Sequence, residues 1–189
     1  MKLSILIPSL ESRSQSLNNL LMVLDNQKKR LSISDTEVEI LTFIDSGENT
    51  IGFKRNKLIE RATGEYVCFI DDDDDISFYY LEELLRGIDK QVDCCSLKGV
   101  ITWDGGSAEI FEHSKKYEAY VTTTNPIKYE RYPNHLNCIK SEIAKQFKFP
   151  EINHGEDTDW ATQINNSGLI KDEYYIDKVI YHYNYKTNK

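Results

Sequence analysis

The chain has 189 residues, 40% hydrophobic and 29% charged, a composition typical of one soluble globular domain with a sizeable core. A formal net charge of −8 excludes a protein held to nucleic acid or anionic lipid by a broad basic surface. The apolar runs are too short to span a bilayer and the N-terminal run lacks a full signal-peptide pattern. We therefore expect no transmembrane segment and a cytoplasmic location.

The first half of the chain alternates patterns typical of strands and helices. The predicted strands are 3–7, 38–44 and 66–70, and the predicted helices are 12–30, 51–62 and 77–88. We expect Pro8 to end the first strand, and Ser77 to start the third helix. Strands that alternate with helices of this length indicate βαβ units, with a mostly parallel central sheet and helices on both faces.

The second half has a different pattern. Residues 92–103 and 108–111 flank a glycine turn and predict a hairpin. Strands are predicted at 117–123 and 176–185, a loop at 124–137, and helices at 141–147 and from about 156 to 168. Ser141 is the expected N-cap of the first of these helices. The whole chain, 1–189, therefore reads as one α/β domain with a smaller antiparallel β extension. The cysteine spacings fit neither a zinc site nor a redox pair, so we expect buried thiols.

Five consecutive aspartates, Asp71 to Asp75, directly follow the predicted strand 66–70. Like charges this crowded repel one another, so a folded protein leaves them in solvent or gathers them around a cation. The end of a sheet strand is where open α/β sheets bind ligands, and oxygen ligands suit Mg²⁺ or Mn²⁺. A solvated acidic loop is the alternative, but the strand before the run and the helix after it favour a cation site.

Five segments in the same order resemble the family 2 glycosyltransferases of GT-A fold. They are Leu3–Pro8, Ile44–Gly47, Lys54–Asn56, Ala62–Asp74 and Gly155–Asp157. The resemblance implies a metal-dependent inverting enzyme that moves a sugar from a nucleotide-sugar donor, with UDP the commonest leaving group, to a hydroxyl acceptor. It also implies that about 1–90 form the half that binds the nucleotide-sugar and that about 91–189 form the half that binds the acceptor.

The aspartate run carries the implied metal site. Asp71 and Asp73 stand two residues apart, so on an extended stretch their side chains point the same way. By resemblance, Asp71 contacts the ribose or the metal, Asp73 ligates Mn²⁺ or Mg²⁺, and Asp72 takes part in donor binding. Some relatives supply a histidine to the metal from the last strand, which makes His182 a candidate ligand. A histidine packed between tyrosines is the alternative.

Further residues are candidate contacts to the donor. They are Pro8, Ser9, Glu11, Asp45, Arg55 and Asn56. Asp45 matches the aspartate that recognises the nucleobase in the family, and capping of its own turn is an equal alternative. Arg55 suits a phosphate contact, whereas Lys54 is expected on a solvated helical face.

The acceptor side carries the implied base. Glu156 and Asp157 stand before a predicted helix, whose N-terminus favours ionised carboxylates. By resemblance Asp157 removes the proton of the acceptor hydroxyl and Glu156 orients a substrate, whereas capping of the helix is the alternative role for both. His135 lies in the expected acceptor loop. Trp103 and Trp160 are candidates for sugar stacking, although aromatic residues at such positions are more often part of the core.

Two other functions are consistent with parts of the sequence. A nucleotidyltransferase would need a glycine-rich basic loop after the first strand, and residues 8–13 contain no glycine. A non-catalytic nucleotide- or carbohydrate-binding module would not need the two acidic elements. The acceptor can be a glycan, a lipid, a protein or a modified base, because acceptor loops carry little pattern.

Overall fold

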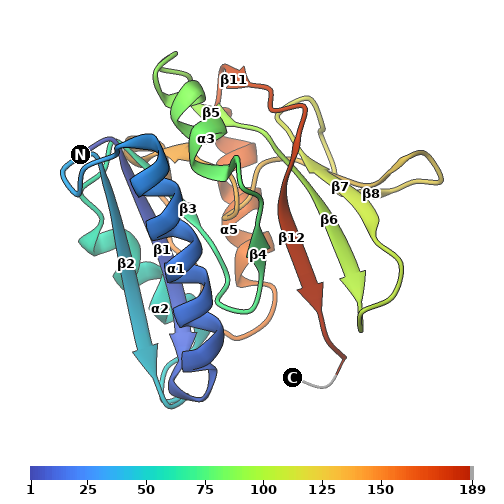
Figure 1. Cartoon of the computed structure of the whole chain (residues 1–189). Helices are drawn as coiled ribbons and strands as arrows, with labels where there is room; N and C mark the ends of the chain where they lie inside the picture. The colour runs from blue at the N-terminus through green and yellow to red at the C-terminus, as the bar shows by residue number, and fades with distance from the viewer. Residues whose placement is uncertain (188–189) are drawn as a thin grey trace.

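Two six-stranded sheets organise residues 1–187, the part of the chain that this computed structural model describes (Figure 1). The strands of the first sheet lie in the order β11 (Glu173–Tyr174), β5 (Cys94–Cys95), β10 (Ile139–Lys140), β3 (Tyr66–Phe69), β1 (Leu3–Leu10) and β2 (Val38–Asp45). The strands of the second sheet lie in the order β4 (Asp75–Ile76), β12 (Val179–Tyr185), β6 (Leu97–Trp103), β7 (Glu109–His113), β9 (Ile127–Arg131) and β8 (Val121–Thr122). The predicted α/β fold is confirmed.

The parallel part of the first sheet is β2-β1-β3, as the sequence predicted. Leu3 of β1 lies between Val38 of β2 and Tyr66 of β3, and all three strands run in the same direction. The prediction that the first strand ends at Pro8 is wrong, because β1 continues to Leu10 along β2. At this point β1 has left β3, so the missing N–H of Pro8 costs no ladder hydrogen bond on that side.

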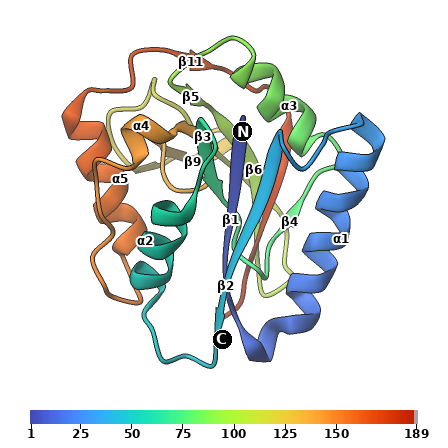
Figure 2. The same cartoon turned by 90° about the vertical axis from the view of Figure 1, so that its left-hand side faces the viewer.

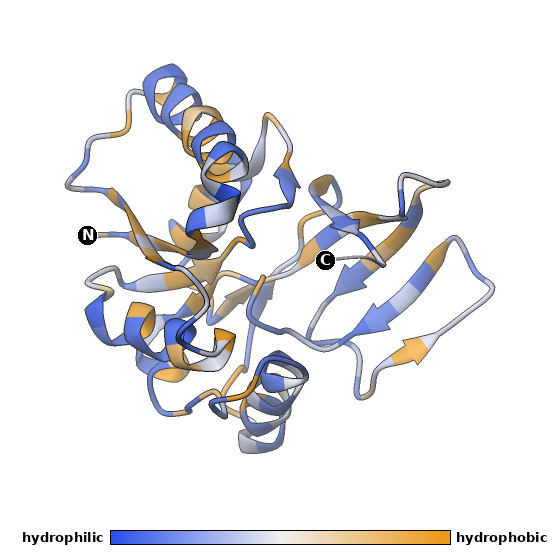
Figure 3. Cartoon of the chain, turned by 90° about the horizontal axis from the view of Figure 1, so that it is seen from below, coloured by the Kyte–Doolittle hydropathy of each residue, from blue (hydrophilic) through white to orange (hydrophobic). Residues whose placement is uncertain are grey.

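Helices cover both faces of the first sheet (Figure 2). One face is covered by α1 (Ser14–Leu31), which follows the short helix η1 (Glu11–Arg13), and by α3 (Tyr80–Ile88); the other is covered by α2 (Ile51–Arg61), α4 (Ser141–Ala144) and α5 (Glu156–Ser167). The side chains of β1 alternate between the two cores, with Ile5 facing α1 and α3, and Leu6 facing α2. Apolar residues accordingly follow the strands in Figure 3, and hydrophilic residues alternate with them along the helices.

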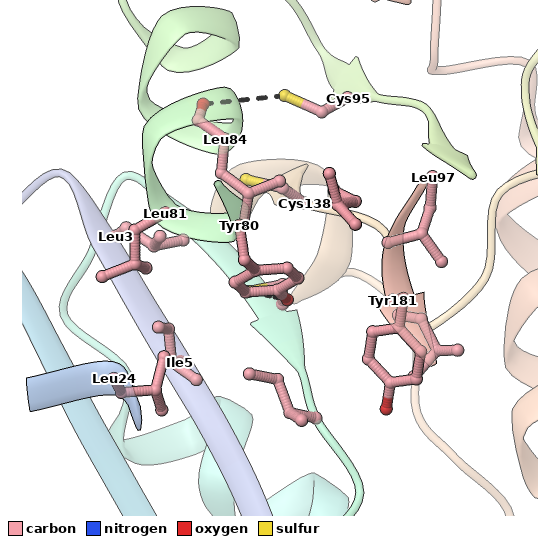
Figure 4. Packing of buried hydrophobic residues seen from close by; sticks show 14 of the residues in the cluster. Leu3, Ile5, Leu24, Tyr80, Leu81, Leu84, Cys95, Leu97, Cys138 and Tyr181 are labelled. Carbon is pink, nitrogen blue, oxygen red and sulfur yellow. Dashed lines mark hydrogen bonds between the residues drawn. The ribbon is translucent and has the colours of Figure 1, made fainter. Parts of the chain in front are cut away.

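The core between the two sheets contains large aromatic side chains. Tyr80 of α3 and Tyr181 of β12 are fully buried, with ring centroids 6.5 Å apart (Figure 4). Cys95 and Cys138 lie in the same cluster, and Cys94 lies in the other. These cysteines and Cys68 are buried free thiols, which confirms the expectation from their spacing.

The second half forms a full sheet rather than a small antiparallel extension. The predicted hairpin is confirmed, because β6 and β7 pair antiparallel. However, β12 pairs parallel to β6, and β7 pairs parallel to β9. Strand β9 occupies part of 124–137, which was predicted to be a loop, and the strand predicted at 117–123 is reduced to β8. The alternating polar residues of β9 gave too weak a strand signal to be recognised.

Several helix boundaries also differ from the prediction. The third helix begins at Tyr80 rather than Ser77, whose hydroxyl instead accepts a hydrogen bond from Tyr79 N. Ser141 is not an N-cap, since α4 begins at this residue and its hydroxyl donates to the carbonyl of Gly64 over 2.5 Å. Among residues 1–187 no helix combines the length and the apolarity needed to cross a membrane.

Candidate functional site

A cleft of about 820 Å³ lies between the two sheets, at the carboxyl ends of β1 and β3. Its lining comes from the end of β1 and the helix η1, the turn after β2, the start of α2, the aspartate run after β3, the loop after β9, and the loop that leads into α5. The facing wall is one side of the second sheet. Of the predicted site residues, those that line the cleft are Pro8, Ser9, Arg55, Asp71, Asp72, Asp73, Glu156 and Asp157. The fold thus brings the two acidic elements together, 80 residues apart in sequence.

The middle of the aspartate run is held by residues that follow β1. Ser9 donates to Asp72 Oδ2 over 2.6 Å, and Arg13 Nη1 donates to Asp72 Oδ1 over 2.9 Å. The same Arg13 atom lies 3.3 Å from Asp73 Oδ2. Asp72 is buried, whereas the side chain of Asp73 is 12% exposed. The buried Asp72 therefore fixes the loop, and Asp73 is the more accessible of the two carboxylates.

The end of the run is anchored to β12. Tyr181 donates to Asp74 Oδ2 over 2.8 Å, and the backbone N–H of Asn184 donates to Asp74 Oδ1 over 2.9 Å. Burial and the nearby charge of Asp71 raise the pKa of Asp74 well above its usual range. Asp75 is exposed and accepts a hydrogen bond from the Asn184 amide. Asp74 is therefore buried and anchors the loop to β12. The alternative of a solvated acidic loop does not describe this residue.

Arg55 of α2 joins the two acidic elements. Its guanidinium is buried and ion-paired with Glu156, and it donates to Asp71 Oδ1 over 2.9 Å and to His135 Nε2 over 3.1 Å. Burial alone would raise the pKa of Asp71, but the charge of Arg55 and its hydrogen bond hold that pKa well below its usual range. For Glu156 burial outweighs the attraction of Arg55, and its pKa is raised. Asp71 is therefore ionised at neutral pH.

Asp157 lies beside His135 at the start of α5. A guanidinium only donates, so His135 Nε2 accepts from Arg55, which in a neutral imidazole leaves the proton on Nδ1. This Nδ1 is buried, has no hydrogen-bond partner among residues 1–187, and lies 3.6 Å from Asp157 Oδ2. The side chain of Asp157 is 33% exposed. A substrate in the cleft can therefore reach this carboxylate.

Neither acidic residue is the N-cap of α5, but Asp157 Oδ1 accepts a hydrogen bond from the backbone N–H of Thr158 in the first turn over 2.7 Å. The N-cap is Gly155, and no side chain there makes a capping hydrogen bond. Gly155 has φ of 84°, a left-handed conformation that is costly for residues with a side chain. This turn presents the first two residues of the helix to the cleft.

Asp45 organises the turn after β2. It accepts hydrogen bonds from the backbone N–H groups of Gly47 and Asn49, each over 3.1 Å, and it is ion-paired with Lys54. Lys54 also donates to the carbonyl of Ser9 over 2.8 Å and is 3% exposed, so its predicted place on a solvated face was wrong. The turn-capping role of Asp45 is confirmed. Its recognition of a nucleobase stays a prediction, because Asp45 does not line the cleft.

This pairing predicts a pH-dependent contribution to stability. Burial opposes ionisation of Asp45, but hydrogen bonds from Lys54 and Asn49 lower its pKa to about 2, from an ordinary value of 3.8. A lowered pKa stabilises the folded state above about pH 4, and this contribution is lost as the pH falls toward 2. We expect urea unfolding to show Asp45→Asn less stable than the wild type at pH 6, with the difference shrinking at pH 3. A difference that is constant with pH would contradict the pairing.

Two predicted donor contacts lie outside the residues that line the cleft. Glu11 is exposed and accepts a hydrogen bond from the Ser46 hydroxyl over 2.6 Å. Asn56 exchanges two hydrogen bonds with the backbone of Phe149, each 2.9 Å, and so anchors the segment before α5. The structure therefore places Asn56 in a scaffold contact rather than beside the nucleotide.

His182 is also separated from the carboxylates it was expected to join. Side chains alternate along β12, and Tyr183 lines the cleft while His182 is exposed and does not. Trp160 is likewise no sugar platform, because it is buried and stacked on Phe149 with ring centroids 4.7 Å apart.

The remaining carboxylates fit a metal ion only in part. In residues 1–187, no group of three or more histidine, cysteine, aspartate or glutamate side chains is arranged to hold a metal. Mg²⁺ in nucleotide sites usually takes one or two protein carboxylates and completes its shell with water and substrate phosphates. Asp71 and Asp73 both line the cleft and offer the oxygen ligands that such an ion prefers. The set therefore fits an ion that arrives with a diphosphate.

Several residues of the cleft were not among the predicted site residues. Arg13 was missed as a partner of the aspartate run, although a cation shortly after the first strand was a usable signal. The side of the second sheet that faces the cleft was missed as well, including His113 and Tyr183. Burial and the charges of His135 and Arg131 lower the pKa of His113 to about 3, so it is neutral at pH 7. Its place in the cleft depends on long-range packing that no local pattern encodes.

The fold and the cleft define an α/β protein whose polar and charged residues gather between two mixed sheets. The profile described as Glycosyl transferase family 2 matches residues 16–150, so the chain belongs to this family. No curated protein is a significant match over the chain.

Solved structures of S. aureus TarS share the fold. TarS 1-349 superposes with a TM-score of 0.65 at 19% identity, covering 97% of this chain and 60% of that one. TarS 1-349 in complex with UDP-GlcNAc gives 0.65 at 18% identity, covering 100% of this chain and 60% of that chain. The complex with UDP gives 0.64 at 18% identity, covering 98% of this chain and 61% of that one. The chain thus spans about 60% of the length of these relatives.

Proposed function

We propose that the chain is a glycosyltransferase that moves a sugar from a nucleotide-sugar, specifically a UDP-sugar, to a hydroxyl acceptor with inversion at the anomeric carbon. Membership of glycosyl transferase family 2 supports the reaction class. The structures of TarS with UDP and with UDP-GlcNAc support the donor, because this chain shares their fold. In the proposed division of labour, about 1–90 bind the donor and about 91–189 bind the acceptor.

One observation carries this proposal more than any other. Asp71 and Asp73, which follow β3, and Asp157, at the start of α5, line a single cleft. Arg55 and His135 lie between Asp71 and Asp157. Transfer of a sugar needs a group that manages the charge of the leaving diphosphate and a base for the acceptor hydroxyl. In the proposal, the first half of the chain supplies the aspartates that manage the charge of the diphosphate, and the second half supplies the base, Asp157, to the same cleft.

In the proposed reaction, Asp157 accepts the proton of the acceptor hydroxyl. The acceptor oxygen then bonds to the anomeric carbon from the side opposite the diphosphate, while the bond from that carbon to the phosphate oxygen breaks. The nucleoside diphosphate leaves with the electron pair. Arg55 keeps Asp71 ionised and holds both Asp71 and Glu156 in place, and His135 Nδ1 lies beside the base, 3.6 Å from Asp157 Oδ2.

A divalent cation, Mg²⁺ or Mn²⁺, would be held by Asp73 and Asp71 together with the donor phosphates. When bound, it neutralises charge on the departing diphosphate. Arg13 lies beside Asp73 and can contribute positive charge to the same region. His182, exposed and outside the cleft lining, is not part of this proposed ligand set.

Metal dependence gives the first test of the proposal. We expect EDTA to abolish release of UDP from a UDP-sugar, and Mn²⁺ or Mg²⁺ to restore it. Asp73→Asn should lose at least about 100-fold in turnover, within the range by which removal of one electrostatic group slows an enzyme. Asp75→Asn should stay near the wild type, because Asp75 is exposed and outside the cleft lining. Liquid chromatography of nucleotides across a panel of UDP-sugars measures both.

Equal and mild effects from both substitutions would remove the metal assignment. The two alternative functions have their own signatures in the same assay. A non-catalytic binding module binds UDP without releasing it from any donor. A nucleotidyltransferase forms a nucleotide-sugar from a sugar phosphate and a nucleoside triphosphate, with release of pyrophosphate.

A further inference from the structure

The wall of the cleft opposite the catalytic carboxylates is a row of aromatic rings on one face of the second sheet. Alternate residues of neighbouring strands point to this face, and β6 and β12 lie side by side (Figure 1). The aromatic rings that line the cleft from the second half of the chain belong to Trp103, Phe111, Tyr120, Tyr129 and Tyr183. Phe111 is buried, whereas Trp103 is 43% exposed. The mouth of the cleft therefore offers open ring surface.

Glu109 of β7 fixes the two outermost rings. Its Oε2 accepts a hydrogen bond from Tyr129 OH over 2.7 Å and from Trp103 Nε1 over 3.3 Å. Tyr185 packs on the other side of Trp103, with ring centroids 4.5 Å apart. The polar atoms of both rings are therefore committed to the protein. The Arg131 guanidinium also lies 5.5 Å from the centre of the Tyr129 ring, so each ring offers a ligand only the face that its neighbour leaves open. Because the rings are already ordered, a ligand that stacks on them loses little entropy.

The cations of this wall are committed as well. Lys128 is ion-paired with Glu109 over 3.1 Å. Arg131 donates to the carbonyls of Val121 and Glu130, over 2.6 and 2.8 Å, and its guanidinium lies 4.9 Å from the centre of the Tyr120 ring. An acceptor with repeated phosphates would find these charges already paired. A neutral ligand with an apolar face fits the wall better.

We propose that Trp103 and Tyr129 form the binding platform for a saccharide acceptor, which stacks a pyranose ring on them in the cleft that Asp157 also lines. The C–H bonds on one side of a pyranose present partial positive charge, which matches the negative face of an aromatic ring. The inference rests on the proposed function, since it names the acceptor class of that site. Glu109 is a positioning residue that holds both rings.

Tryptophan fluorescence tests the platform without any turnover. The chain has two tryptophans, and Trp160 is buried, so a change on ligand binding reports on Trp103. With UDP and Mn²⁺ present, the protein is titrated with methyl hexosides, N-acetylhexosaminides and their di- to tetrasaccharides. Glycerol phosphate oligomers and phospholipid vesicles serve as competing acceptor classes. We expect a saturable emission change with at least one neutral saccharide.

Variants then locate the binding. By calorimetry, Trp103→Leu should weaken the saccharide about tenfold, and Trp103→Phe should weaken it less because a ring remains. Glu109→Ala should also weaken binding, by freeing both rings. Phe78→Leu is the matched control, since Phe78 is an exposed aromatic outside the cleft. UDP affinity should be unchanged in all four variants.

Each outcome decides one question. If no saccharide binds, if Trp103→Leu binds it as well as the wild type, or if only the phosphate oligomer or the vesicles bind, the saccharide platform is wrong. These results do not affect the proposed donor site as long as UDP binds. Failure of UDP itself to bind would instead overturn the proposed function.

Discussion

We expect Asp157→Asn to lower kcat by about 10²- to 10⁴-fold, the usual contribution of a general base, with little change in UDP affinity or melting temperature. An amide cannot take the proton of the acceptor hydroxyl, but it has nearly the same shape as the carboxylate. Asp157 Oδ1 accepts a hydrogen bond from the Thr158 N–H in the first turn of α5, and the side-chain oxygen of an asparagine can accept the same bond, so little stability is lost. Turnover, UDP affinity and thermal unfolding are measured on the same preparation.

Asp159→Asn is the matched control for this result. Asp159 lies two residues further along α5, is exposed, and accepts a hydrogen bond from Gln163 instead of lining the cleft. It should keep wild-type turnover. If Asp157→Asn were as active as Asp159→Asn, Asp157 would not be the base. If it lost turnover and UDP binding together, its role would lie on the donor side.

Arg55→Met is expected to lower the free energy of unfolding by about 3–5 kcal/mol, the usual effect of removing one partner of a buried ion pair. Arg55 is buried between Asp71 and Glu156, and its removal leaves both carboxylates in the cleft without their cation. The measurement is urea unfolding at pH 7. Arg55→Lys should lose less, because the charge remains although one ammonium cannot reproduce the fork.

Arg86→Met provides the comparison on the surface. Arg86 pairs with Glu82 and Glu83 on α3, but its side chain is 52% exposed, so its loss should cost less than about 1 kcal/mol. Adding Glu156→Gln to Arg55→Met should recover part of the stability, since one unpaired charge is then removed. Equal losses from the Arg55 and Arg86 variants would mean that the buried network does not hold the site together.

The parallel part of the fold could be predicted because its signals are local. The apolar runs of β1, β2 and β3 and the helical spacing of leucines in α1 each depend on a few neighbouring residues. β9 was missed because its pairing with β7 is made across the sheet, and because three of its five residues are charged, which weakens the strand pattern. Pro8 was likewise misinterpreted, because a proline fits inside β1 only where β3 no longer pairs with that strand.

For the site, the sequence identified charged residues but not their partners. The Asp71–Asp73 spacing and the Glu156–Asp157 pair pointed to one cleft, and the structure brings both elements there. The sequence of α2 could not show that Lys54 is buried against Asp45, because a helical pattern does not tell which segment packs on the helix. For His182, the period of two along β12 could have shown that it and Tyr183 face opposite ways.

Calorimetric titration with UDP, GDP and CDP, with and without Mn²⁺, tests the central claim most directly. The claim is that the cleft between the sheets binds a uridine diphosphate together with a metal ion. UDP should bind with a Kd in the micromolar to millimolar range, or about −4 to −8 kcal/mol, more tightly with Mn²⁺ than without it and more tightly than GDP or CDP. Asp73→Asn should remove the Mn²⁺ effect. Tighter binding of GDP or CDP, or UDP binding that Mn²⁺ leaves unchanged, would contradict the claim.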